Sequence, residues 1–312
     1  MTGQVFTDFA SASLPIIILI FFGYVLRRWM LRDDAIWASI DTLNFQVLIP
    51  ALIIGTISQA DILEIAAWEI LVCIAVVLAV LSLVLGIVYW AAVPVVLEKE
   101  AFSSVFQTST RWNASIALVV IAAFFDGSAV AVVAVVMVGL MPLVNAINIT
   151  VLVELHNKSD SMLLTAMVNV LKNPIILGCI IGISIASLSI GIPSVVQESF
   201  ELMGQASIAT VLLSLGSGLK ISQISGNVTP IALSTFLKLI AMPSLVYFLG
   251  TGLGIGHSTV VIMTVATAMP TAMNGYVLAK KMGGDAPLYA SCGTVQTLLS
   301  FVTVPLWVLA LL

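Results

Sequence analysis

The chain has 312 residues, of which 61% are hydrophobic and only 8% are charged. Soluble domains carry about 25% charged residues, so this composition excludes a soluble globular protein and predicts an integral membrane protein. The formal net charge of -4 decides little, because few charges contribute to it.

Apolar runs recur along the whole chain at the length that a membrane-spanning helix needs, about 20 residues. They predict an all-α polytopic membrane protein with about ten spans joined by short connections. The start of the chain lacks the basic region of a cleavable signal peptide, so the first apolar run is expected to remain as a span. The expected spans lie near 10–27, 36–58, 67–92, 101–125, 128–153, 165–187, 195–217, 228–250, 258–279 and 287–311.

Basic residues follow every second expected span. The connections after the first, third, fifth, seventh and ninth spans hold Arg27, Arg28, Arg32, Lys99, Lys158, Lys220, Lys280 and Lys281. The alternate connections contain no Lys or Arg. Because cytoplasmic loops are enriched in these residues, we expect a multi-pass protein of the cell membrane with both termini outside the cytoplasm.

A polar stretch that begins at residue 154 divides the expected spans into two sets of five. We therefore expect a first five-helix repeat at 1–153, a cytoplasmic linker at 154–164 and a second repeat at 165–312. Because each half has an odd number of spans, the second half enters the membrane from the side opposite to that of the first half. The repeats would then be inverted, which is a common plan for carriers.

The fourth and ninth spans hold the most polar interruptions, "TSTRWNAS" and "ATAMPTAMNGY". Pro270 lacks a backbone donor and disfavours helix just before itself, and Asn274 follows closely. Irregular backbone at membrane depth is tolerated only where it is buried in protein or lines a cavity. We expect broken helices in both spans, whose half-helix N-termini would offer N–H donors to a carboxylate.

Two basic residues, Arg111 and Lys238, lie roughly ten residues into their spans, or about 15 Å deep. A charge at this depth is costly, so each should face an aqueous cavity, a partner or a substrate. Arg111 would attract an anionic substrate, with an ion pair to Asp41 or Glu201 as the structural alternative. Lys238 could exchange a proton, act as a fixed internal cation, pair helices or snorkel.

Several motifs resemble the auxin efflux carrier family over essentially the whole chain. "LKNPIILGCIIG" is similar to the start of that family's second half, "MPTAMNGYVLAKKMGGD" is similar to its ninth span, and Asn113 stands where its fourth span has an asparagine. The resemblance implies a scaffold domain, a transport domain with two crossing broken helices, and export or exchange of organic anions. These anions are auxin in plant members and malonate- or malate-like carboxylates in bacterial members.

Two departures from the plant members are visible. Trp112 stands where they carry the crossover proline, and their long central hydrophilic loop is missing, as in a compact bacterial-type carrier. If Trp112 is superposed on Pro270, Thr271 matches Asn113. The expected substrate-binding residues are Arg111, Asn113, Pro270, Thr271 and Asn274. Their structural alternative is to satisfy backbone groups at broken helices.

Further polar residues of the second, seventh and eighth spans are expected to line the cavity, support the crossing or couple transport. Inter-helix hydrogen bonds are the structural alternative. These residues are Lys238, Asp41, Asn44, Gln46, Gln205 and Ser207.

The sequence therefore predicts a secondary transporter of small organic anions that works by alternating access. A sodium-coupled symporter of the bile-acid type remains an alternative, as does an anion channel in which Arg111 and Lys238 form a charged constriction. No nucleophile–base pair, HExxH motif, phosphate-binding loop or paired histidine ligands are present, so we expect no enzymatic activity, cofactor or metal site. The expected partners are the anion and the lipid bilayer, not nucleic acid, and a homodimer is left open.

Overall fold

The computed structural model describes residues 2–60, 66–92, 98–125, 127–156, 172–219, 228–273 and 275–311. Most of these residues are helical and none of them lies in a strand, which confirms the predicted all-α fold. Five of the described helical segments are long and apolar enough to cross a membrane: Asp34–Ile57, Ala67–Trp90, Gly127–His156, Val228–Gly252 and Ala286–Leu311.

Each expected span contains helix, and the fourth and ninth are interrupted. The first part of the chain forms α1 (Thr2–Trp29), α2 (Asp34–Leu43), the π-helical turn η1 (Asn44–Leu48), α3 (Ile49–Ile57), α4 (Ala67–Ala92), α5 (Lys99–Thr110), α6 (Ala114–Phe124) and α7 (Gly127–His156). The second part forms α9 (Pro174–Ser187), α10 (Ser194–Ser217), α11 (Val228–Phe236), the π-helical turn η3 (Leu237–Ala241), α12 (Met242–Gly252), α13 (His257–Thr267), α14 (Gly275–Met282) and α15 (Ala286–Leu311).

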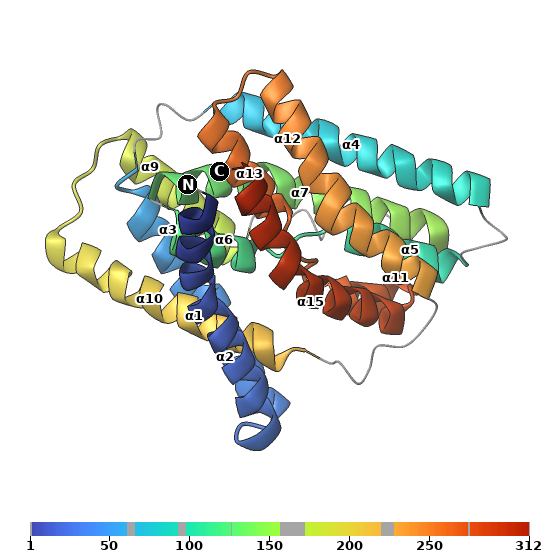
Figure 1. Cartoon of the computed structure of the whole chain (residues 1–312), viewed down its shortest axis with the longest axis horizontal. Coiled ribbons are helices and arrows are strands. Elements are labelled where there is room, and N and C mark those ends of the chain that lie inside the picture. Colours follow the sequence, from blue (N-terminus) through green and yellow to red (C-terminus); the bar gives the residue numbers. More distant parts are fainter. Residues whose placement is uncertain are drawn as a thin grey trace.

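The helices gather in two groups (Figure 1). In one group α10 packs on α1 and α3, and α3 packs on α9. In the other, α4 packs on α7 and α12, and α5 packs on α11 and α15. The short helix α6 lies between the groups and contacts α7, α10 and α13.

The first group is held together by close helix contact at glycines. A Cβ at Gly23 of α1 would lie 2.0 Å from the carbonyl oxygen of Leu213, and a Cβ at Gly216 of α10 would lie 1.8 Å from that of Ile20. Small residues allow such backbone approach in membranes, where packing replaces the hydrophobic effect as the force between helices. The backbones of α1 and α10 are therefore in direct contact, and a side chain at either glycine would force them apart.

Both π-helical turns precede a proline, Pro50 after η1 and Pro243 after η3. A proline cannot donate to the carbonyl four residues earlier. In the second turn this carbonyl belongs to Leu239, and the indole Nε1 of Trp307 donates to it across 2.9 Å. The backbone change is thus stabilised by a side chain from α15.

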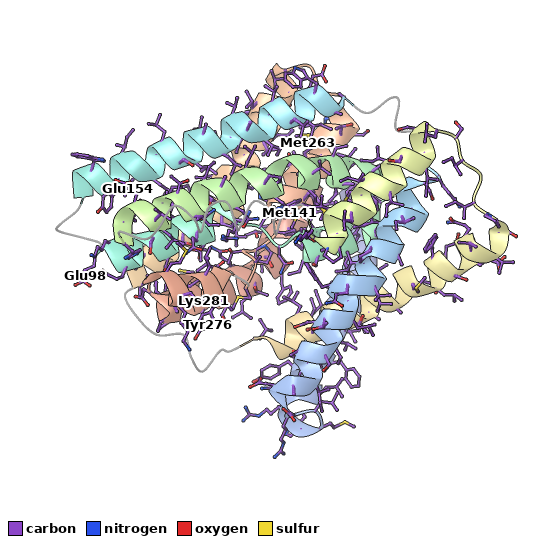
Figure 2. The ribbon with its side chains drawn as sticks, turned by 180° about the vertical axis from the view of Figure 1, so that it is seen from behind. Glu98, Met141, Glu154, Met263, Tyr276 and Lys281 are labelled. Carbon is purple, nitrogen blue, oxygen red and sulfur yellow. The ribbon has the colours of Figure 1, made fainter. Side chains whose placement is uncertain are left out.

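The described residues that border three connections expected on the cytoplasmic side lie at one end of the molecule (Figure 2). Figure 2 shows Glu98, Glu154 and Lys281 at this end and Met263 farther from it. The backbone N–H of Asp285 donates to the carbonyl of Glu100 across 3.0 Å, which joins two of these connections directly. Of the basic residues expected in cytoplasmic connections, Lys99 and Lys281 border this end, and Lys158 and Lys220 lie outside the described residues.

Candidate functional site

The two broken spans meet at their breaks. The fourth span is interrupted between α5 and α6, where Arg111 has an extended backbone with ψ of 148°. The ninth span is interrupted between α13 and α14. The backbone N–H of Asn113 donates to the carbonyl of Pro270 across 2.9 Å, so the two breaks are joined by a main-chain hydrogen bond.

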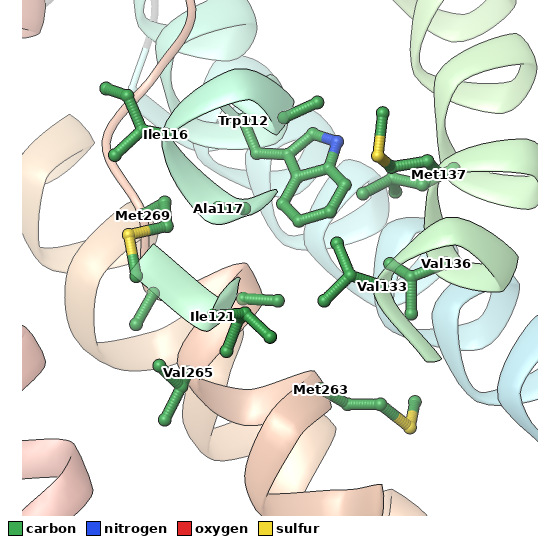
Figure 3. Packing of buried hydrophobic residues seen from close by; sticks show 14 of the residues in the cluster. Trp112, Ile116, Ala117, Ile121, Val133, Val136, Met137, Met263, Val265 and Met269 are labelled. Carbon is green, nitrogen blue, oxygen red and sulfur yellow. The ribbon is translucent and has the colours of Figure 1, made fainter. Parts of the chain in front are cut away.

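The break in the fourth span forms without a proline. Asn113 is the N-cap of α6, with its side-chain Oδ1 accepting from the N–H of Ile116 at 3.2 Å. Asparagine is among the best residues for this position because it satisfies a free helix donor. Trp112 is 5% exposed, and its ring lies near Val133 and Met137 of α7 (Figure 3). A cap and a buried aromatic ring therefore define this break.

The break in the ninth span is held by two side chains of α15. Gln296 accepts from the N–H of Thr271 at 3.0 Å and donates to the carbonyl of Thr108 at 3.1 Å. The hydroxyl of Tyr289 donates to the carbonyl of Ala272 at 2.6 Å and lies 3.2 Å from Oγ1 of Thr271. The hydroxyl of Thr271 is thus engaged within the protein.

Both breaks line one cavity of about 600 Å³. From the fourth span it is lined by 111–116, and from the ninth by Ala272 and Met273. Residues of α7 and α15 also line it and form one wall together with the breaks. Residues of α2, η1, α9 and α10, which belong to or pack on the other helix group (Figure 1), form the opposite wall. The volume falls within the range of about 300–1,000 Å³ usual for small-molecule sites.

Among the described residues, Arg111 lies at this cavity without a carboxylate partner. Its Nη1 donates to Oδ1 of Asn145 at 3.1 Å, and the residue is only 6% exposed. Within the described residues, its Nε and Nη2 have no hydrogen-bond acceptor. These two groups form one edge of the guanidinium, the edge that binds a carboxylate through two parallel hydrogen bonds.

The expected structural alternative for Arg111 is wrong. Asp41 accepts a hydrogen bond from Ser214 instead, and Glu201 accepts from Gln197 at 3.2 Å and lines a different cavity. Neither carboxylate pairs with the guanidinium.

The N-terminus of α6 adds further donors to the cavity. Asn113, Ala114 and Ser115 all line it. The first N–H groups of a helix have no intrahelical partner, and in the described part of the chain the cap takes only that of Ile116. Free backbone donors and a guanidinium at one place are suited to an anion.

Lys238 lies next to the end of α13, near the second break, and does not line the cavity. It is fully buried, and its Nζ lies 3.1 Å from the carbonyl of Thr267 and 3.2 Å from Sδ of Met242. Thr267 ends α13, where carbonyls lack helical donors. The snorkelling interpretation is therefore wrong, and the helix-pairing interpretation is supported, because the ammonium group joins η3 to the end of α13.

The other predicted residues that the structure describes fall in three places. Asp41, Asn44 and Gln46 line the same cavity as Arg111. Gln205 lines a second cavity of about 570 Å³, formed by α3, α10, the end of α6 and the start of α7. Ser207 is fully buried, and Asn274 lies outside the described residues.

Sequence reasoning missed four residues that the structure brings to the site or its support: Asn145, Ser214, Tyr289 and Gln296. The amides of Asn145 and Gln296 lie within long apolar runs, where polar side chains usually bond between helices. That position was the signal that could have identified them.

The chain is similar to known transport proteins. The sequence profile of the family described as Membrane transport protein matches residues 9–308. An uncharacterized transporter, YfdV, of Escherichia coli strain K12 is 26% identical over 176 residues, as are the YfdV proteins of Escherichia coli O157:H7 and Shigella flexneri. These matches span 53% of this chain and 54% of each relative, about half of either length.

Proposed function

Because the chain belongs to the membrane transport protein family, which includes the auxin efflux carriers, we propose that it is a secondary transporter of small organic carboxylates working by alternating access. The family consists of transporters, not enzymes. The single observation that carries the choice of substrate is Arg111, a buried guanidinium at the cavity with two unpaired donors.

The carboxylate would bind between Arg111 and the N-terminus of α6. The guanidinium of Arg111 would turn its buried Nε and Nη2 toward the two carboxylate oxygens, and the N–H groups of Ala114 and Ser115 would complete the anion site. Asn113 positions α6 by capping it. Pro270 and Thr271 would act on the site indirectly, by fixing the position of the second break. The carbonyl of Pro270 accepts from Asn113, and the N–H of Thr271 donates to Gln296.

The proposed membrane arrangement follows from the basic loops. Ten spans would form two inverted five-helix repeats, 1–153 and 165–312, joined by the cytoplasmic linker 154–164, with both termini outside the cell membrane. The cavity of Arg111 includes Asp41 and Asn173, in the expected cytoplasmic halves of their spans, and Gly218, just after the expected cytoplasmic end of another. It would therefore open to the cytoplasm, and the cavity of Gln205 would face outward.

A thin packed layer separates the two cavities, which supports a carrier over an anion channel. On α3, Ile49 lines the cavity of Arg111 and Leu52 lines the cavity of Gln205. On α10, Val211 lines the first of these cavities and Ile208 lines the second. Three residues of helix correspond to about 4.5 Å. A small displacement between the helix groups would open one side and close the other, whereas a channel needs one continuous path.

The charges at the crossing support a carrier without sodium coupling over the bile-acid type of symporter. Arg111 and Lys238 already place two positive charges beside the breaks. Within the described residues neither forms an ion pair, so both positive charges would oppose the binding of a metal cation next to the breaks.

A panel of radiolabelled carboxylates in proteoliposomes tests this function. Uptake of at least one small carboxylate should be saturable, should require the protein and should persist when sodium is replaced by potassium. Absolute dependence on sodium would favour the symporter. Failure of every carboxylate, with imposed proton and sodium gradients of either direction, would contradict the proposed substrate class.

A further inference from the structure

The cavity holds a second charged group, on the wall opposite Arg111. Asp41 belongs to α2 and lies seven residues beyond Asp34, which begins this helix. Seven residues of helix place it about 10 Å farther into the span. A carboxylate within a span is costly and usually faces a cavity or a functional partner.

Asp41 is not neutralised by the protein. Ser214 of α10 donates a hydrogen bond to its Oδ1, and within the described residues Asp41 forms no ion pair. It is exposed, and both it and Ser214 line the cavity. Among the described lining residues, Asp41 and Arg111 are therefore the two charged groups, one of each sign and on opposite walls.

We propose that the substrate is amphoteric: a small carboxylate that also carries a cationic nitrogen, such as an amino acid, with Asp41 binding the nitrogen. This inference rests on the proposed function, because Arg111 and α6 would hold the carboxylate. A substrate with charges at both ends would complement both walls. A dicarboxylate would instead bring a second negative charge into the cavity with Asp41, and like charges brought together oppose binding.

The structural alternative is that Asp41 only joins α2 to α10 through Ser214. The two roles can be separated by mutation. Asp41→Asn keeps a side-chain oxygen for Ser214 and removes the negative charge. Ser214→Ala keeps the charge and removes the hydrogen bond. Glu198→Gln is the matched control, because Glu198 is exposed on α10 and lines neither cavity.

The ligands should form two matched series that differ only in the amine. Glycine, 3-aminopropanoate, 4-aminobutanoate and 5-aminopentanoate place the nitrogen at increasing distance from the carboxylate. Acetate, propanoate, butanoate and pentanoate are the controls without nitrogen. Binding to the purified full-length protein would be measured by calorimetry for each ligand, with thermal unfolding of every variant recorded alongside.

We expect the best amino ligand to bind at least about 10-fold more tightly than its matched carboxylate, as for one charge-assisted hydrogen bond. Affinity should pass through a maximum at one chain length, where the ligand spans both walls. Asp41→Asn should remove this preference, whereas Ser214→Ala and Glu198→Gln should keep it.

Two results would overturn the inference, and they are distinguishable. If the plain carboxylates bind as well as their amino partners, or if Asp41→Asn retains the preference, the amphoteric substrate is wrong and the carboxylate carrier stands. If no ligand of either series binds and no carboxylate is transported in proteoliposomes, the proposed function fails and this inference fails with it.

Discussion

The backbone N–H of Asn113 donates to the carbonyl oxygen of Pro270 across 2.9 Å. These residues are far apart in sequence and belong to the two interrupted spans. The bond places the start of α6 against the second break, and both segments then line one cavity. The geometry of the proposed anion site therefore depends on residues from both halves of the chain.

Asn113 caps α6, and mutation can separate this role from the need for a site without negative charge that binds an anion. Asn113→Asp should keep the cap of α6, because aspartate caps as well as asparagine. It should nevertheless weaken carboxylate binding strongly, since it adds a negative charge to an anion site. Asn113→Ala should lose about 1 kcal/mol of stability through the lost cap. Calorimetry and thermal unfolding of both variants check this, and tight carboxylate binding by Asn113→Asp would contradict it.

Gln296 supports the crossing through hydrogen bonds to the N–H of Thr271, the carbonyl of Thr108 and the hydroxyl of Ser234. Gln296→Leu should be strongly destabilising, because each buried polar group left unpaired costs about 1–3 kcal/mol. Thermal unfolding in detergent measures this effect. Gln205→Leu on the exposed side of α10 is the control and should change stability little. Equal melting temperatures for the two variants would argue against a supporting role.

Lys238 should affect transport without affecting affinity. Lys238→Met removes the donor to the carbonyl of Thr267 at the end of α13, but Lys238 does not line the cavity. We expect a lower maximal transport rate with an unchanged half-saturation concentration. Lys280→Met, at the exposed end of α14, is the matched control. A Lys238→Met variant with the transport rate of the control would show that the half-helix end needs no cation.

The proposed topology can be tested with single cysteines in a variant lacking Cys73, Cys179 and Cys292, all of which are buried. Lys99→Cys and Lys281→Cys should react with an impermeant thiol reagent only after cells are permeabilised. Gly191→Cys, between α9 and α10, should react in intact cells, and a Cβ there meets no atom within 4 Å. Labelling of Lys281→Cys from outside would reverse the arrangement.

The helical architecture and both interruptions were predictable from the sequence. Apolar length located the spans, and polar residues inside apolar runs located the breaks. The break at Trp112 was harder to predict, because it depends on the cap by Asn113 and on burial of the indole against α7, not on a proline.

The partners of the two deep cations were not predictable. Sequence reasoning sought acidic partners for Arg111, whereas the structure provides the amide of Asn145. It did not foresee that Lys238 would meet the end of α13, because that contact depends on how η3 packs against the second break. Contacts between distant spans follow from tertiary packing, which a single sequence does not specify.

Counterflow in proteoliposomes tests the central claim most directly. The carboxylate that is taken up best would be loaded inside, and uptake of the radiolabelled compound would be followed for wild type, Arg111→Gln and the exposed control Arg32→Gln. Loss of a charge-assisted hydrogen bond costs about 1.5–3 kcal/mol, or roughly 10- to 150-fold in affinity. We predict saturable uptake accelerated by internal carboxylate in wild type and Arg32→Gln, and a half-saturation concentration raised by that factor in a folded Arg111→Gln. Linear, voltage-driven flux, or wild-type counterflow by Arg111→Gln, would contradict the account.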